Sequence, residues 1–168
     1  LETAKRRDRD ARVPYLQWIN QGHIERTEGD ATDFGAIRAT INKMRETYNI
    51  KEIAYDPWNA LQVANELRSD GFEVVKFPQT MANMSEPTKK LLRLLVSKQI
   101  AFGHNPVLRW MASNVSAVED GSGLIRADKK RSTEKIDGIV ALVMALGRWI
   151  AQESKKPSVY EDRGMVTA

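Results

Sequence analysis

The chain is organised around one decapeptide, Lys51-Glu52-Ile53-Ala54-Tyr55-Asp56-Pro57-Trp58-Asn59-Ala60, a short apolar run that ends in a carboxylate. Residues 53–55 suit a buried strand. Pro57 cannot continue a central ladder but fits the first turn of a helix, which places Asp56 at a strand-to-helix junction. Ligands bind at that end of strands in open α/β sheets. The decapeptide alone nevertheless favours a simpler interpretation, in which Asp56 caps a helix that has Pro57 at its first position.

The flanking patterns predict alternating helices and strands. We expect a helix capped by Asp33, a helix over 58–69 ended by Gly71, and a strand over 72–77. The apolar stripe of the first helix is expected to be core and consists of Phe34, Ile37, Ile41, Met44 and Tyr48. Such alternation indicates a parallel sheet with right-handed crossovers, so the fold class is α/β.

The remaining segments give weaker signals. A short helix is expected between Pro14 and Gly22, followed by a weak strand pattern over 22–27. Residues 78–87 are expected to form a polar loop, and 88–98 a helix whose four leucines are buried. Asn105 is expected to cap a further helix, with Pro106 in its first turn.

Composition limits the chemistry that is available. The 168 residues (19.0 kDa) suit one domain, contain no cysteine and only two histidines, and carry a net charge of +4. A thiolate or histidine metal site is therefore excluded, and any metal must be held by oxygen, which favours magnesium, manganese or calcium. The lack of cysteine fits a reducing cytosol, and no apolar run is long enough to span a membrane.

Basic residues gather in the second half of the chain. Between Ser85 and Lys135 ten residues are Lys or Arg and five are Asp or Glu. Residues 114–128 carry a hairpin pattern, and its return arm leads directly into Lys129-Lys130-Arg131. The hairpin suits a nucleic-acid backbone, and it equally suits an ordinary surface hairpin with solubilising lysines.

A second carboxylate opens the stretch from Ser132 to Gly147. Ser132 or Thr133 is expected to cap a helix that is apolar all round beyond Asp137 and therefore deeply buried. Small residues on and beside the face of Asp137, namely Gly138, Ala141 and Ala145, would let this helix approach a sheet closely. Asp137 could simply complement the helix dipole, a contribution of about 0.3 to 1 kcal/mol. A divalent cation shared with Asp56, or the nearby Lys135, would offset its desolvation.

Three motifs follow one another along the chain. They are Ile-Ala-Tyr-Asp-Pro-Trp-Asn-Ala (53–60), Asn-Pro-Val-Leu-Arg-Trp-Met-Ala-Ser-Asn-Val (105–115) and Ser-Thr-Glu-Lys-Ile-Asp-Gly-Ile-Val-Ala-Leu (132–142). In this order they resemble one known family, the C-terminal nuclease domain of tailed-phage terminase large subunits. The resemblance covers about Val13 to Ile150. It implies a ribonuclease-H-like mixed sheet flanked by helices, and an endonuclease that cuts concatemeric viral DNA during packaging with two Mg²⁺ or Mn²⁺ ions.

The resemblance also implies roles for residues and partners. Asp56 and Asp137 match the catalytic, metal-binding carboxylates on the fourth core strand and the last helix. The DNA-binding candidates beside them are Lys129, Lys130, Arg131, Lys135 and Arg126. The implied partners are double-stranded viral DNA, the terminase small subunit and the portal protein, in the cytoplasm of a bacterial host and with no membrane involved.

One departure from the family pattern stands out. The family's first carboxylate lies on a first core strand that precedes the region matching Leu1, and neither Asp8 nor Asp10 resembles a replacement. We therefore expect a nuclease-domain fragment over 1–150 that lacks its first strands, followed by a polar tail over 151–168. The resemblance also implies an ATPase domain upstream, and no phosphate-binding glycine-rich loop is present in this sequence.

Two other functions fit the same residues. One is a resolvase-like nuclease on the same fold, which would cut branched rather than linear duplex. The other is a non-catalytic module that binds DNA or a portal through the basic region between Ser85 and Lys135.

Overall fold

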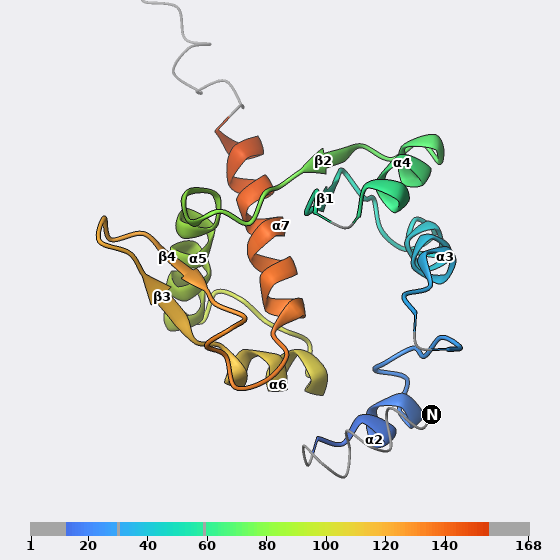
Figure 1. The fold of residues 1–168 in the computed structure, drawn as a ribbon, viewed down its shortest axis with the longest axis horizontal. Coiled ribbons are helices and arrows are strands. Elements are labelled where there is room, and N and C mark those ends of the chain that lie inside the picture. Colours follow the sequence, from blue (N-terminus) through green and yellow to red (C-terminus); the bar gives the residue numbers. More distant parts are fainter. Residues whose placement is uncertain (1–12, 30, 59, 155–168) are drawn as a thin grey trace, which may run out of the picture.

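The computed structural model describes residues 13–29, 31–58 and 60–154. Figure 1 labels its helices and strands. Their bounds are α2 (Tyr15–Asn20), α3 (Phe34–Met44), β1 (Ile53–Tyr55), α4 (Leu61–Ser69), β2 (Val74–Lys76), α5 (Met81–Val96), α6 (Pro106–Asn114), β3 (Ala117–Glu119), β4 (Ile125–Ala127) and α7 (Asp137–Glu153). The prediction of a mixed α/β protein is confirmed.

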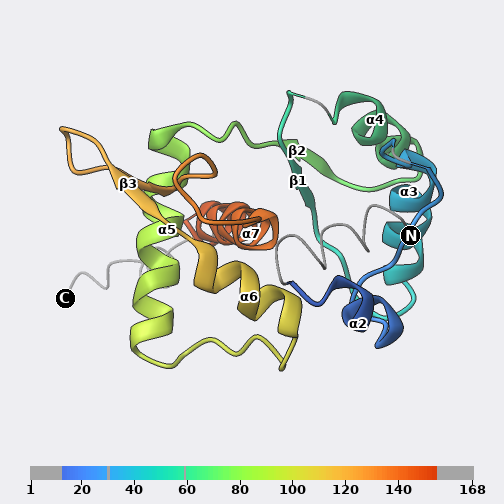
Figure 2. The ribbon, with the colours of Figure 1, turned by 60° about the horizontal axis from the view of Figure 1, so that its bottom comes forward.

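Helix α7 lies at the centre of the molecule. In Figures 1 and 2, α5 and the β3–β4 hairpin lie on one side of α7, while β1, β2, α4 and α3 lie on the other. Strands β1 and β2 pair in parallel, with Ile53 opposite Val74, and β3 pairs with β4 in antiparallel fashion, with Val118 opposite Arg126. The predicted parallel connection and the predicted hairpin are both confirmed. Within the described residues, each sheet has two strands.

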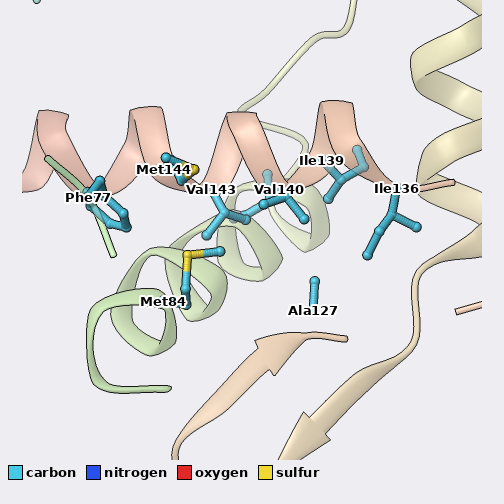
Figure 3. Close-up of a cluster of buried hydrophobic side chains, with 9 residues drawn as sticks. Phe77, Met84, Ala127, Ile136, Ile139, Val140, Val143 and Met144 are labelled. Atoms are coloured by element: carbon cyan, nitrogen blue, oxygen red, sulfur yellow. The ribbon is translucent and has the colours of Figure 1, made fainter. Parts of the chain in front are cut away.

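The larger hydrophobic cluster joins α7 to α5 and to the hairpin (Figure 3). Met84, Ile136 and Val143 are its most completely buried large side chains. A close approach requires Gly147 in α7, because a Cβ atom there would lie 2.7 Å from two ring atoms of Phe77. The cluster consists of Phe77, Met84, Leu91, Ala127, Ile136, Ile139, Val140, Val143 and Met144.

A second cluster lies between the β1–β2 pair and α4. It consists of Tyr55, Val63, Ala64, Leu67, Phe72 and Val74. Successive side chains of a strand point to opposite faces, so Tyr55 enters this cluster while Ala54 packs against the larger one. Strand β1 thus lies between the two clusters.

Three segments differ from the sequence prediction. Helix α4 begins at Leu61 rather than at residue 58, and residues 22–27 form turns and irregular chain instead of a strand. Helix α5 begins at Met81, where the Thr80 side chain accepts a hydrogen bond from the Asn83 amide at 3.2 Å, and it includes Pro87. The predicted loop over 78–87 is therefore mostly helix.

Apolar periodicity predicted too much burial. No residue of α3 is buried, and Ile37, Met44 and Tyr48 are exposed although all three were expected in the core. Of the four leucines expected to be buried in α5, only Leu91 is. Both helices pack one narrow face inward, so a stripe of apolar residues wider than that face must reach solvent.

The ends of the chain lie partly outside the described residues. Helix α7 continues to Glu153, beyond the domain end that was expected at residue 150. The expectations for the charged arm over 1–12, including Asp8 and Asp10, and for most of the polar tail lie outside the described part. None of the helices in the described part is both long and apolar enough to cross a membrane.

Candidate active site

Asp56 follows the last residue of β1 and is half-buried. Its Oδ1 accepts a hydrogen bond from the backbone amide of Trp58 at 3.1 Å, which closes a turn two residues long. The residue that caps α4 is Ala60, without a side-chain bond. The interpretation of Asp56 as a helix cap is therefore wrong, and its carboxylate is held at the strand end by the loop itself.

Asp137 is the first residue of α7, and its side chain is 58% exposed. Its Oδ1 lies 2.6 Å from Nζ of Lys129. The expectation of deep burial is wrong, because Ala141, Ala145 and Trp149 continue an exposed face along the helix. The expected partner Lys135 is not the residue in contact, and Lys129 supplies the positive charge instead.

The start of α7 also differs from the prediction. Ile136 occupies the cap position, so neither Ser132 nor Thr133 caps the helix. Gly138 does permit a close approach, but to α6 rather than to a sheet. A Cβ atom at Gly138 would lie 2.9 Å from Sδ of Met111 and 3.0 Å from a methyl carbon of Leu108.

Contacts between β1 and α7 give the relative direction of the two elements. At one end, Arg148 Nε donates to Glu52 Oε1 at 2.5 Å. Further along β1, Ala54 lines the same groove as Ala141 and Ala145, and this groove has a volume of about 260 Å³. A step forward along β1 from Glu52 to Ala54 thus corresponds to a step back along α7 from Arg148 toward Ala141. Asp56, beyond Ala54, and Asp137, before Ala141, both lie toward the other end of the pair.

The loop that leads to Asp137 is held by hydrogen bonds at several points. The carbonyl of Asp128 accepts from the amide of Ser132 at 3.0 Å and from its hydroxyl at 2.7 Å. Asn114, which is buried, donates through Nδ2 to the carbonyl of Lys135 at 3.2 Å, and its own carbonyl accepts from the amide of Thr133 at 3.3 Å. The backbone between the hairpin and α7 is thereby fixed.

A pocket of about 230 Å³ opens beside Asp137. Its lining mixes two lysines with two acidic side chains and a hydroxyl, and Asp56 is not part of it. The lining residues are Lys129, Ser132, Glu134, Lys135, Ile136 and Asp137. The two ammonium groups and the hydroxyl can donate to phosphate oxygens, while the two carboxylates balance the charge of the lysines.

The five basic residues that the sequence singled out divide into two groups. Lys129, Lys130, Arg131 and Lys135 are exposed around the loop. Arg126 is half-buried and donates from Nη1 to the carbonyl of Gln79 at 2.8 Å, while its Nε atom is buried and without a hydrogen-bond partner. Arg126 therefore faces the junction of the hairpin with α5.

Helix α5 holds the hairpin in place. Lys89 Nζ donates to the carbonyl of Gly123 at 2.9 Å, and the buried Ser85 hydroxyl accepts from the amide of Ile125 at 3.1 Å. These contacts fix the direction in which the hairpin leaves the molecule (Figure 1).

The carboxylates present fit an oxygen-liganded ion in part. No group of three or more acidic or histidine side chains with metal-site geometry exists among the described residues. Asp137 already holds a cation, the ammonium group of Lys129, so the position beside its Oδ1 accepts positive charge. Magnesium retains several waters and substrate phosphate oxygens, so one or two carboxylates can suffice to hold it.

Two features near the site were not predicted. Trp58, two residues from Asp56, is 86% exposed, although its sequence context suggested a helical position. Asn114 was quoted only as part of a motif, and no sequence signal reveals that it fixes a loop twenty residues away. An Asn in a helix end is ordinary, and only the tertiary contact gives it this role.

Comparison with known proteins gives consistent results. Residues 1–153 match the family described as "Terminase large subunit, endonuclease domain". The terminase large subunit of Enterobacteria phage HK97 is 26% identical over 163 residues, which are 96% of this chain and 32% of that protein. Protein YmfN of Escherichia coli K12 is 27% identical over 90% of this chain and 34% of its own length. The chain thus spans about a third of the length of these curated relatives.

Two solved structures share the architecture. The crystal structure of the HK97 bacteriophage large terminase superimposes with a TM-score of 0.81 at 28% identity, covering 88% of this chain and 31% of that one. The large terminase nuclease from the thermophilic phage G20c superimposes with a TM-score of 0.55 at 18% identity, covering 70% of this chain and 63% of that one, and supports the fold alone. With the family match over nearly its whole length, this chain belongs to the family of terminase large subunit endonuclease domains.

Proposed function

We propose that this chain is a metal-dependent DNA endonuclease that cuts concatemeric viral DNA during genome packaging. The observation that supports it most directly is that Asp137, at the start of α7, lines a pocket together with two lysines, while Asp56 ends the strand that packs against α7. The site would take Mg²⁺ or Mn²⁺, two ions by analogy with the family. Such ions activate a water molecule and stabilise the leaving oxygen of an in-line phosphodiester displacement.

The residues of the chain would hold and orient the reacting groups. The Trp58 amide engages one oxygen of Asp56, which leaves the second oxygen for a ligand. Asp137 is exposed and reaches solvent from the start of α7. In this proposal both carboxylates would be metal ligands.

The basic residues would position the duplex through its phosphates. Lys129, Lys130, Arg131 and Lys135 surround the loop between the hairpin and α7. Contacts of this kind give affinity without reading the sequence. Arg126 belongs to the proposed DNA-binding set, and its contact with Gln79 would also orient the hairpin.

Further parts of the proposal follow from the family. The sheet is proposed to be ribonuclease-H-like, and the protein to act in the host cytoplasm with the terminase small subunit, the portal protein and an ATPase domain of the same polypeptide. Its substrate would be double-stranded viral DNA.

A nicking assay on supercoiled plasmid tests the proposal. With Mn²⁺, we expect Asp56→Asn and Asp137→Asn each to lower the rate at least about 100-fold, because a lost metal ligand removes several kcal/mol of transition-state stabilisation. Glu134→Gln is the matched control, since Glu134 lines the same pocket as Asp137 but is no proposed ligand. Both aspartate variants should still bind DNA.

The same assay separates the alternatives. A wild-type chain that binds plasmid but does not nick it with Mn²⁺ would identify a non-catalytic packaging module. Nicking that survives both aspartate changes would show that other residues carry the cleavage. Preferential cleavage of a four-way junction over linear duplex would identify a resolvase-like nuclease.

A further inference from the structure

The contact between Lys129 and Asp137 is the closest charge pair at the candidate site. The ammonium nitrogen lies 2.6 Å from Oδ1, and the two side chains are 50% and 58% exposed. Exposed pairs of this kind are weak, because water screens both charges and the long lysine side chain loses rotamer freedom. The pair can therefore be broken by any stronger ligand for either member.

The backbone of the loop places Lys129 next to Asp137. Asp128 holds the turn through its side chain, which accepts from the Lys130 amide at 2.8 Å, and through its carbonyl, which accepts from Ser132. Ser132 in turn accepts from the Ser116 amide at 3.1 Å, which ties the turn to the base of the hairpin. The Cα atom of Lys129 is thus fixed, while its four-carbon side chain is free to change direction.

An ammonium group and a divalent ion cannot share one carboxylate oxygen at contact distance, since both are positive. An ion that takes Oδ1 of Asp137 must displace Lys129, and an ion on Oδ2 would lie close enough to the ammonium group for the two positive charges to repel each other. The pocket lined by Lys129 also contains Ser132 and Lys135, whose donors suit a phosphate. A displaced Lys129 would find DNA phosphates within the same pocket.

We propose that Lys129 is an exchangeable counter-ion, which neutralises Asp137 in the metal-free protein and transfers its charge to a DNA phosphate when a divalent cation binds Asp137. This inference rests on the proposed function. The local charge of the pair changes from zero to a surplus of two when a divalent ion joins it. Ion binding and DNA binding are therefore coupled through Lys129, and each raises the affinity of the other by the same factor.

The first test measures Mn²⁺ binding to the full chain without DNA, by electron paramagnetic resonance of the free ion. We expect Lys129→Met, which keeps the aliphatic stem and removes the ammonium group, to bind Mn²⁺ roughly 1.5- to 5-fold more tightly than wild type, the range that an exposed ion pair allows. Lys129→Arg should bind Mn²⁺ with nearly the affinity of wild type. The same is expected of Lys130→Met, which removes an exposed charge from the next residue. Asp137→Asn should weaken binding.

The second test measures affinity for a short duplex with and without Ca²⁺, which takes the same oxygen ligands as Mg²⁺ in a looser geometry. Lys129→Met should weaken DNA binding more with Ca²⁺ than without it, because only then does the ammonium group contact a phosphate, and with Ca²⁺ it should reduce the slope of log affinity against log salt by about 1. Lys130→Met should weaken binding equally in both conditions. A thermal melt of each variant confirms that it is folded.

The outcomes separate this inference from the proposed function. If Mn²⁺ binds through Asp137 but Lys129→Met leaves its affinity unchanged or lower, the counter-ion role is wrong and the nuclease proposal stands. Equal effects of Lys129→Met on DNA binding with and without Ca²⁺ also contradict it. If neither wild type nor Lys129→Met binds Mn²⁺, both proposals fail together.

Discussion

Asp56 and Asp137 are held in different ways, the first just after β1 and the second as the first residue of α7. The carboxylate of Asp56 is tied to its own loop through the Trp58 amide, whereas that of Asp137 is tied to a lysine eight residues earlier. The first contact is local and rigid, and the second is an exposed ion pair between two side chains. Of the two, Asp137 is therefore the one whose surroundings can change when a ligand arrives.

Asn114 determines the geometry of the loop before Asp137. We expect Asn114→Ala to lower the free energy of unfolding by about 1 to 3 kcal/mol, because the carbonyl of Lys135 loses its donor in a partly buried setting. Hydrogen exchange should increase over 132–137 more than elsewhere. The control is Ser113→Ala, a change at an exposed neighbour that bonds only within its own helix. Unchanged exchange over 132–137 would show that Asn114 does not hold the loop.

Among the secondary-structure elements, α3 and α4 are joined by a carboxylate at the end of α4. Asp70 accepts hydrogen bonds from Arg38 Nε at 2.7 Å and from Asn42 Nδ2 at 2.8 Å. The hydrogen bonds from Arg38 and then Asn42 hold the pKa of Asp70 well below its usual range. Because α3 has no fully buried residue, these polar contacts carry much of its attachment.

The depressed pKa of Asp70 predicts how stability depends on pH. A carboxyl group with a folded-state pKa below its unfolded value of about 3.9 stabilises the protein above that value, and the contribution is lost as pH falls through the folded pKa. We expect Asp70→Asn to lower the free energy of unfolding at pH 7. The difference in this free energy between wild type and variant should shrink progressively below about pH 4. Urea unfolding at several pH values measures this difference.

The control for Asp70→Asn is a substitution that removes a different negative charge near α3. Glu46→Gln alters an exposed residue just beyond α3 and should leave the pH profile of wild type nearly unchanged. A gap between Asp70→Asn and wild type that stays constant down to pH 2 would mean that packing, and not charge, links α3 to α4.

In the molecule as a whole, β1 connects two hydrophobic clusters. Ala54 packs against the cluster around α7, and the next residue, Tyr55, belongs to the cluster around α4. The ion pair between Glu52 and Arg148 adds a polar link between the same two parts. A strand with side chains in both clusters should make the two clusters unfold together.

Calorimetry of two core variants tests this cooperativity. Met84→Ala in the larger cluster and Leu67→Ala in the smaller cluster should each lower the free energy of unfolding by about 2 to 5 kcal/mol, because both side chains are at most 2% exposed. Each should lower the midpoint of the same single transition, by about 2 to 4 °C per kcal/mol for a chain of this size. Two transitions, each moved by only one of the variants, would show that the clusters unfold independently.

The sequence by itself determined the α/β class, the parallel β1–β2 pair, the hairpin, the caps at Asp33 and Asn105, and the family. These features depend on local chemistry: side-chain periodicity, turn residues and capping oxygens act within a few residues. Only the tertiary structure decided that Asp56 is no cap, that Asp137 is exposed and paired with Lys129, and that α3 is half in solvent. Burial and charge pairing depend on which distant segment packs against a residue, and that is not encoded in the spacing of its neighbours.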